Sequence, residues 1–146
     1  MGCVQWLCPY IGTYEAADDE REVVFRIETA MPIPFDDLED YVMNTGPVLV
    51  DLDWINEMGE LEGDDIYFGP DDAAAYDDKD RHSLLIVGLG TRWNGQGYTH
   101  FWIVRNCYGT SWGDGGYAKF SREMIHGRYL INNEGWAPVG ISFEGF

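Results

Sequence analysis

The sequence predicts an α+β domain: a twisted antiparallel β-sheet, or half-barrel, with one or two short helices. Its 18 glycines and 6 prolines allow many tight turns, and 15% of its 146 residues are aromatic. Aromatic and β-branched residues favour strands, and here they recur in short runs between turn residues. Hydrophobic residues make up 45% of the chain. The chain can therefore bury a core of its own, and its length favours a single domain over residues 1–146.

One strand is predicted near the start of the chain, between irregular segments. Residues 1–13 are expected to be irregular, and residues 16–22 form an acidic loop. Residues 23–27 are β-branched and aromatic and predict a short strand. Pro32 and Pro34 are expected to break the chain after it.

A short helix is predicted over residues 35–42. Its apolar side chains recur at helical spacing along one face: Phe35, Leu38, Tyr41 and Val42. Acids in the first turns suit the positive end of the helix dipole. The helix is expected to end at Gly46-Pro47.

An acidic segment follows a probable strand over residues 48–53. Residues 57–80 hold ten acids and one lysine, and runs of like charge are usually solvated. We expect a loop here, anchored by the apolar residues 66–68. A calcium site is the alternative, but the acid spacing of an EF-hand is absent, and we predict no metal.

The second half of the chain predicts a hairpin and two further strands. Residues 83–90 form a continuous apolar run closed by glycines, which indicates a buried strand. Residues 98–106 are its hairpin partner across a polar turn at 91–97. The remaining segments are a turn at 113–116, a strand at 117–120, one helical turn within 121–127 and a tail at 129–146 that closes the sheet.

The net charge of -17 and the pI near 4.2 disfavour several partners. Nucleic acids and anionic membrane surfaces attract basic proteins, so we expect neither as a partner. No apolar run reaches the 18 residues of a membrane-spanning helix. The first residues lack a basic segment followed by a long apolar one, so no signal peptide is predicted. We also expect no cofactor.

His82 and Asn106 are the candidate catalytic residues. His82 comes directly before the predicted buried strand, and Asn106 ends the next one. Antiparallel neighbours would bring these side chains together at the rim of the sheet. An amide oxygen can accept a hydrogen bond from an imidazole N–H and so fix its tautomer and orientation. The alternative is that His82 is a structural residue.

Several segments resemble the motifs of papain-like cysteine peptidases. Residues 106–117, Asn-Cys-Tyr-Gly-Thr-Ser-Trp-Gly-Asp-Gly-Gly-Tyr, resemble the family signature Asn-Ser-Trp-Gly-Thr-x-Trp-Gly-x-x-Gly-Tyr. Residues 81–90 are similar to its His-Ala-Val-x-x-Val-Gly-Tyr-Gly segment, and 101–105 to its Tyr-Trp-x-x-Lys strand. Further matches, in the family's order, are Gly46-Pro47-Val48, residues 65–68 and residues 8–12.

This resemblance implies the C-terminal, sheet-rich lobe of a two-lobed peptidase. That lobe supplies His82 and Asn106, with Ser83, Tyr108 and Trp112 in the substrate cleft. The other lobe, which supplies the nucleophilic Cys and an oxyanion-hole Gln, is expected to be absent from residues 1–146. Its partner would be a peptide or protein substrate, or a complementary N-terminal lobe. Family members usually reside in lysosomes or vacuoles or outside the cell.

No cysteine of this chain is predicted to be the nucleophile. Cys8 precedes His82 by 74 residues, short of the roughly 130–150 usual in the family. Position 2, six before Cys8 where the family has Gln, is Gly2, and Cys3 has no room for such a partner. Cys3 and Cys8 could pair with each other, which the sequence leaves open. Cys107 stands at the signature's Ser and is expected to fill a packed site.

Three departures from the family pattern concern the cleft. Arg81 precedes His82 where the family often has Asp or Asn, and a nearby cation disfavours an imidazolium unless it points away. Tyr108 replaces the Trp that covers the His–Asn hydrogen bond. Ser83 makes its pocket more polar. Three hypotheses follow: the lobe of a cysteine peptidase, inactive alone; a non-catalytic pseudoprotease that acts as a binding or regulatory module; or a vestigial product with no selected activity.

Overall fold

A computed structural model of the chain describes residues 13–15 and 22–144. These residues form one eight-stranded sheet in the order β1-β2-β8-β3-β5-β6-β7-β4. The strands are β1 (Thr13–Glu15), β2 (Glu22–Ile33), β3 (Val48–Trp54), β4 (Ile66–Tyr67), β5 (Asp80–Trp93), β6 (Tyr98–Arg105), β7 (Tyr117–Ser121) and β8 (Gly135–Glu144). All pairs are antiparallel except β4 with β7. The predicted twisted, mainly antiparallel sheet is confirmed.

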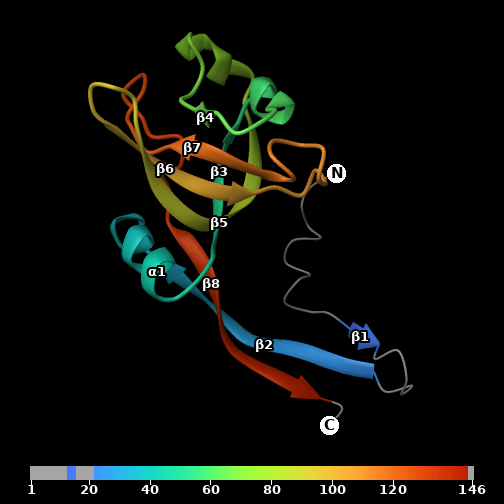
Figure 1. Cartoon of the computed structure of the whole chain (residues 1–146). Helices are drawn as coiled ribbons and strands as arrows, with labels where there is room; N and C mark the ends of the chain where they lie inside the picture. The colour runs from blue at the N-terminus through green and yellow to red at the C-terminus, as the bar shows by residue number, and fades with distance from the viewer. Residues whose placement is uncertain (1–12, 16–21, 145–146) are drawn as a thin grey trace.

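The sheet has two parts, a curled body and a long ribbon (Figure 1). Strands β3, β5, β6 and β7 curl around the core. Strands β2 and β8 pair over nearly their whole length and extend away from this body. Strand β8 joins the body through two pairs with β3, Leu49 with Trp136 and Val50 with Gly135.

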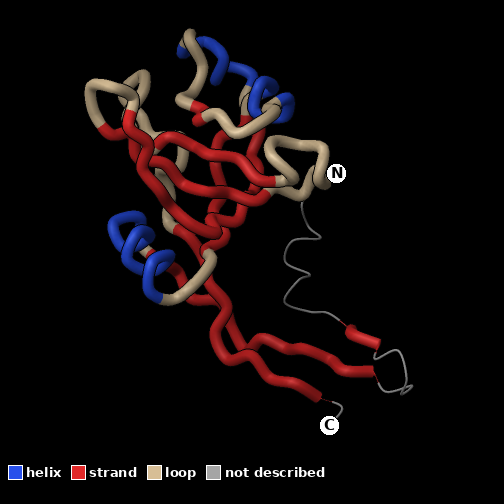
Figure 2. Tube along the Cα trace, in the orientation of Figure 1, coloured by secondary structure: helices blue, strands red, loops and turns tan. Residues whose placement is uncertain are grey.

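The helices are short and lie outside the sheet (Figure 2). The single α-helix in the described ranges is α1 (Leu38–Asn44), entered through the 3-10 helix η3 (Phe35–Asp37). The helix predicted over residues 35–42 is thus confirmed, with a first turn that is 3-10. The others are η4 (Asn56–Glu60) and η5 (Ala73–Asp78).

The core lies between the inner face of the sheet and the segments that cover it. Strand β3 alternates strictly, with Val48, Val50, Leu52 and Trp54 buried. Leu38 of α1 is also fully buried. This alternation fixes which side chains of β5 face inward, because residues opposite each other on paired strands share a face.

Strand β5 is longer than predicted and contains a bulge. It begins at Asp80 and pairs His82 with Leu52, so His82 lies within the strand and not before it, as the sequence analysis placed it. Its hairpin with β6 skips one residue, Val87, between the pairs Ile86–Val104 and Gly88–Ile103. An inserted residue of this kind shifts the register by one.

Other predicted boundaries need correction. Strand β2 continues through Pro32, which pairs with Trp136. The described residues pair this part of β2 with β8 alone, and a proline is tolerated on such an edge. The acidic segment 57–80 is not simply a loop, because it holds η4, β4 and η5. Residues 121–127 form no helical turn but a tight bridge of Ile125 with Arg128.

The tail contains strand β8. The prediction named no neighbouring strand for it, and β8 lies between β2 and β3. Gly135 stands where β8 crosses β3. A Cβ atom at this position would lie 2.1 Å from Val48 Cγ1 and 3.1 Å from the Leu49 carbonyl oxygen. Only glycine permits this approach.

We predict that Gly135→Ala lowers the free energy of unfolding by at least about 2 kcal/mol, because the new methyl group overpacks a buried, β-branched neighbour. Urea denaturation followed by circular dichroism measures it. The matched control is Gly97→Ala, since a Cβ at Gly97 would meet nothing within 4 Å. Equal stability of the two variants would contradict the close crossing of β8 and β3.

Candidate active site

The structure brings His82 and Asn106 into direct contact. His82 Nε2 lies 2.8 Å from Asn106 Oδ1. Asn106 follows the last residue of β6 and is 3% exposed, whereas His82 is half-buried on β5. The neighbouring strands β5 and β6 therefore hold the two side chains together, as the sequence predicts.

A second hydrogen bond defines the tautomer of His82. The main-chain N–H of Cys107 donates to the same Asn106 Oδ1 at 2.7 Å, so this atom acts as the amide oxygen. An amide oxygen only accepts, so His82 Nε2 must carry the hydrogen. In the neutral ring, Nδ1 then keeps its lone pair and can accept a proton from a nucleophile.

Aromatic rings enclose the imidazole. The Trp54 ring lies 4.2 Å from His82, centroid to centroid, and the Tyr108 ring lies 5.1 Å away. Tyr108 stands at the signature position whose aromatic side chain is expected to cover the His82–Asn106 hydrogen bond. Trp54 was not foreseen, although it extends the apolar alternation of β3 by one step. The two rings shield the His82–Asn106 hydrogen bond and strengthen it by excluding water.

Burial lowers the pKa of His82 below its ordinary value, and the hydrogen bond to Asn106 and the charge of Asp51 oppose this shift. The predicted effect of Arg81 is small, because its guanidinium turns to Asp53 at 3.1 Å. Arg81 pairs with Asp53 across β3 and β5, on the face opposite to that of the Leu52–His82 pair.

Ser83 lies beside His82 but on the opposite face of β5. Its hydroxyl donates to the carboxylate of Asp51, its cross-strand partner on β3. Ser83 was predicted from the family resemblance, whereas Asp51 was not, because its position follows only from the β3–β5 register. The carboxylate of Asp51 therefore lies next to the hydroxyl of Ser83 on this face of the sheet.

Tyr108 and Trp112 line a hollow of about 220 Å³, and Tyr108 is also in ring contact with the imidazole of His82. Trp112 is buried, and its indole N–H donates to the Met58 carbonyl oxygen at 2.9 Å. Gly59, Glu60, Leu61, Glu62 and Ser111 complete the lining. The acidic composition of residues 57–80 predicted a solvated loop for the two glutamates, and only the folded path of η4 and the residues after it places them here.

Cys107 is disulfide-bonded. The signature position predicted only a small side chain filling a packed site, and this bond was not foreseen. A disulfided sulfur has no thiol to deprotonate and cannot act as a nucleophile. The chain's other cysteines, Cys3 and Cys8, lie outside the described residues, and so does the question of their pairing with each other.

The arrangement suits proton transfer at a single imidazole. Within the described ranges, no group of three or more His, Cys, Asp or Glu side chains could hold a metal ion. None of the helices described is long and apolar enough to cross a bilayer. An imidazole oriented with its hydrogen on Nε2 can take a proton from a thiol at Nδ1 and later return one to a leaving group.

An oriented imidazole–carboxamide pair of this kind is typical of thiol-dependent acyl transfer. The family model described as "Papain family cysteine protease" matches residues 9–139, and the chain belongs to this family. The resemblance stated from the motifs is confirmed.

Individual relatives agree with this assignment. Cathepsin L of Sarcophaga peregrina is 33% identical over 121 residues, which cover 80% of this chain and 34% of the relative. Digestive cysteine proteinase 2 of Homarus americanus is 35% identical over 85 residues, which cover 58% of this chain and 24% of the relative. The chain thus spans about a quarter to a third of the length of these relatives.

Solved structures share the fold. Procathepsin B from Trypanosoma congolense superposes with a TM-score of 0.62 at 21% identity, covering 81% of this chain and 37% of that one. The bromelain protease from Ananas comosus, solved with the inhibitor E64, gives a TM-score of 0.62 at 21% identity, covering 78% and 51%. The predicted papain-type sheet fold is confirmed.

We predict that Asn106→Ala lowers the free energy of unfolding by about 2–4 kcal/mol. It leaves the N–H groups of His82 and Cys107 without their acceptor in a largely buried site. Chemical denaturation measures the change. Asn133→Ala, which removes a longer and more exposed amide bond of 3.4 Å to Asp51 O, should cost under about 1 kcal/mol. A harmless Asn106→Ala would contradict the hydrogen-bonded pair.

The lowered pKa of His82 predicts a pH dependence of stability. Below about pH 6.5 this histidine becomes protonated in the unfolded chain, whereas in the folded chain it stays neutral to a lower pH. Stability present above pH 6.5 should therefore fall as the pH drops from 7.5 to 5.5. The carboxyl pKa values of Asp53 and Glu39 are also lowered, but their contributions are lost at more acidic pH. Urea unfolding at the two pH values should show a smaller loss for His82→Gln than for the natural chain; equal losses would refute the shift.

Proposed function

We propose that this chain supplies the His–Asn half of a cysteine peptidase site that cleaves peptide or protein substrates. His82 is the general base and acid, and Asn106 is its positioning residue. The attacking thiol comes from a complementary N-terminal lobe that these 146 residues do not contain. The single observation that supports the proposal most is the hydrogen bond from His82 Nε2 to Asn106 Oδ1.

The geometry supports a two-step acyl transfer. His82 Nδ1 accepts the thiol proton, and the thiolate attacks the peptide carbonyl carbon. The imidazolium then gives this proton to the leaving amine, and an acyl-enzyme remains. In the second step the imidazole takes a proton from water, which attacks the thioester, and returns it to the departing thiolate. Asn106 keeps Nε2 occupied throughout, so that Nδ1 faces the reacting atoms.

The disulfide at Cys107 supports a compartment for this function. Disulfides persist in oxidising surroundings and are rare in the cytosol. We therefore propose a lysosomal, vacuolar or extracellular location.

A non-catalytic binding or regulatory module is the second candidate. The observation that favours it is the lowered pKa of His82, because a thiolate–imidazolium pair requires a charged ring. A docked lobe that brings a thiolate to Nδ1 would raise this pKa again by charge attraction. The peptidase proposal therefore requires a second lobe that carries a thiol, whereas the non-catalytic module requires none.

A thiol-directed epoxide probe tests the proposal. The 146-residue chain alone should remain unlabelled. Joined to an upstream coding segment that carries Gln-x-x-x-x-x-Cys-Trp, it should be labelled at that cysteine. His82→Ala should then reduce peptide hydrolysis at least about 10³-fold. Labelling of Cys3 or Cys8 that His82→Ala abolishes would contradict a separate thiol lobe, and absence of any such upstream segment would favour the non-catalytic module.

A further inference from the structure

We propose that the hollow beside Tyr108 and Trp112 binds a basic side chain, and that Glu60 and Glu62 select it. The inference builds on the proposed function, which places a peptide across His82. It adds a substrate class: peptides with arginine or lysine close to the cleaved bond.

Tyr108 connects the hollow to the reacting imidazole. Tyr108 forms part of the lining of the hollow, and the ring of Tyr108 lies 5.1 Å from that of His82. Tyr108 and Trp112 meet edge to face at 6.4 Å, which makes one continuous aromatic wall. The volume of about 220 Å³ far exceeds the roughly 15 Å³ that one water needs. A long side chain that leaves the backbone near His82 can therefore enter it.

Two carboxylates in this hollow have no counter-ion among residues 13–15 and 22–144. Glu60 ends η4 and Glu62 follows two residues later, and both are exposed. Within the described ranges, no basic side chain pairs with either of them. Five described basic side chains pair with other acids, namely Asp53, Asp64 and Glu39.

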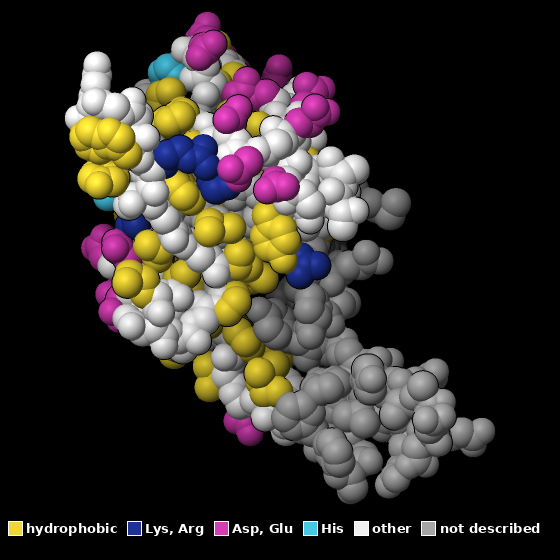
Figure 3. Space-filling view, in the orientation of Figure 1, with side chains coloured by type: hydrophobic (Ala, Val, Ile, Leu, Met, Phe, Trp, Pro, Cys, Tyr) yellow, Lys and Arg dark blue, Asp and Glu magenta, His cyan; other side chains and the backbone are white. Residues whose placement is uncertain are grey.

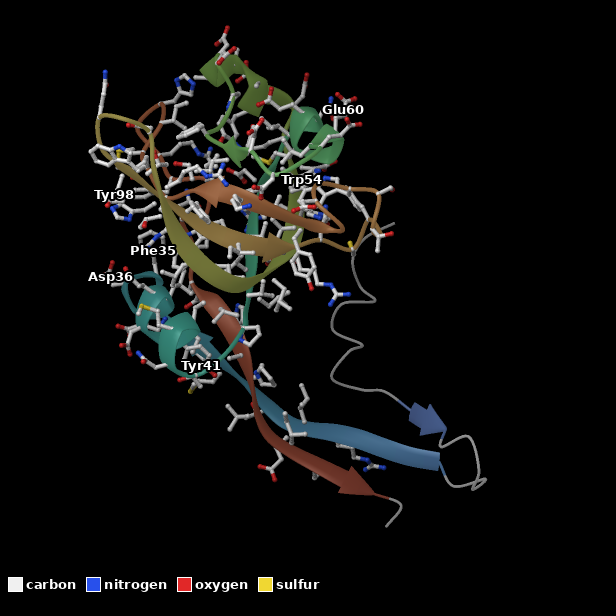
Figure 4. The ribbon with its side chains drawn as sticks, viewed as in Figure 1. Phe35, Asp36, Tyr41, Trp54, Glu60 and Tyr98 are labelled. Atoms are coloured by element: carbon white, nitrogen blue, oxygen red, sulfur yellow. The ribbon has the colours of Figure 1, made fainter. Side chains whose placement is uncertain are left out.

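The position of these carboxylates adds to their effect. In Figure 4, Glu60 and Trp54 lie at the same end of the sheet, away from Phe35 and Asp36. Figure 3 shows acidic side chains gathered at this end, over η4 and η5. The local field therefore attracts a cation and repels an acidic side chain.

The aromatic wall favours the same ligand. Aromatic faces attract ammonium and guanidinium groups. Tyr108 is 45% exposed, so its ring is accessible to a ligand. An aliphatic stem can pack against the exposed Tyr108 ring while its charged end reaches the carboxylates. A purely apolar side chain would gain the first contact and leave both carboxylates unpaired.

The experiment is an NMR titration of the ¹⁵N-labelled 146-residue chain with capped amino acids. The probes are N-acetyl-arginine methylamide, its norleucine analogue and its glutamate analogue. The indole N–H of Trp112 and the amides of residues 59–62 report on the hollow. The arginine probe should bind about tenfold more tightly than norleucine, the sum of two exposed ion pairs and one cation–π contact. The glutamate probe should shift these signals least.

Two double variants separate local from general charge effects. Glu60→Gln with Glu62→Gln should reduce the arginine preference to below about twofold. Asp77→Asn with Asp78→Asn removes the same charge from exposed positions of η5 outside the hollow and should retain the preference.

Three results would overturn the inference: equal binding of arginine and norleucine, an equal loss of preference in both double variants, or arginine-induced shifts that leave Trp112 and residues 59–62 unchanged. Failure of the proposed function would appear instead in the epoxide labelling, which involves neither glutamate.

Discussion

The bulge at Val87 is the constraint on which the candidate site depends. From the hairpin turn, β5 and β6 pair so that Trp93 faces Tyr98 and Gly88 faces Ile103. Had this register continued, Asn106 would stand opposite Leu85 and share the face of Ser83. The inserted residue moves the pairing by one. Asn106 then stands beyond the Leu85–Arg105 pair, next to Leu84, on the same face as His82. One extra residue in a strand thus brings the base and its positioning residue to one side of the sheet.

Much of the fold was predictable, because the chain carries strong local signals. The alternation in β3, the apolar run of β5 and the periodicity of residues 35–42 each specify an element without reference to the others. The contact of His82 with Asn106 followed from adjacency in a hairpin. Trp54 was within reach of the same reasoning, since it extends the alternation of β3 from Leu52.

Features that depend on distant parts of the chain were not predictable. The disulfide of Cys107 requires a partner brought close by the fold, and a residue type in a signature cannot reveal it. Glu60 and Glu62 belong to an acidic run that local composition assigns to solvent. Their place beside Trp112 depends on η4, whose Met58 carbonyl accepts the indole N–H. Pro32 was expected to break the chain, yet it lies within β2. A proline is tolerated there because, among the described residues, this part of β2 pairs only with β8.

The ribbon of β2 and β8 has a consequence for how copies of the chain meet in concentrated solution. A long ribbon presents main-chain groups along its outer edges, which is a template for intermolecular pairing and fibril growth. Each of its strands carries a proline, Pro32 in β2 and Pro138 in β8, and Gly140 has a positive φ of 70°. Prolines offer no N–H to an incoming strand, and a left-handed residue interrupts the straight edge. These residues act as gatekeepers that oppose self-association, a task they share with the mutual repulsion of a highly charged surface.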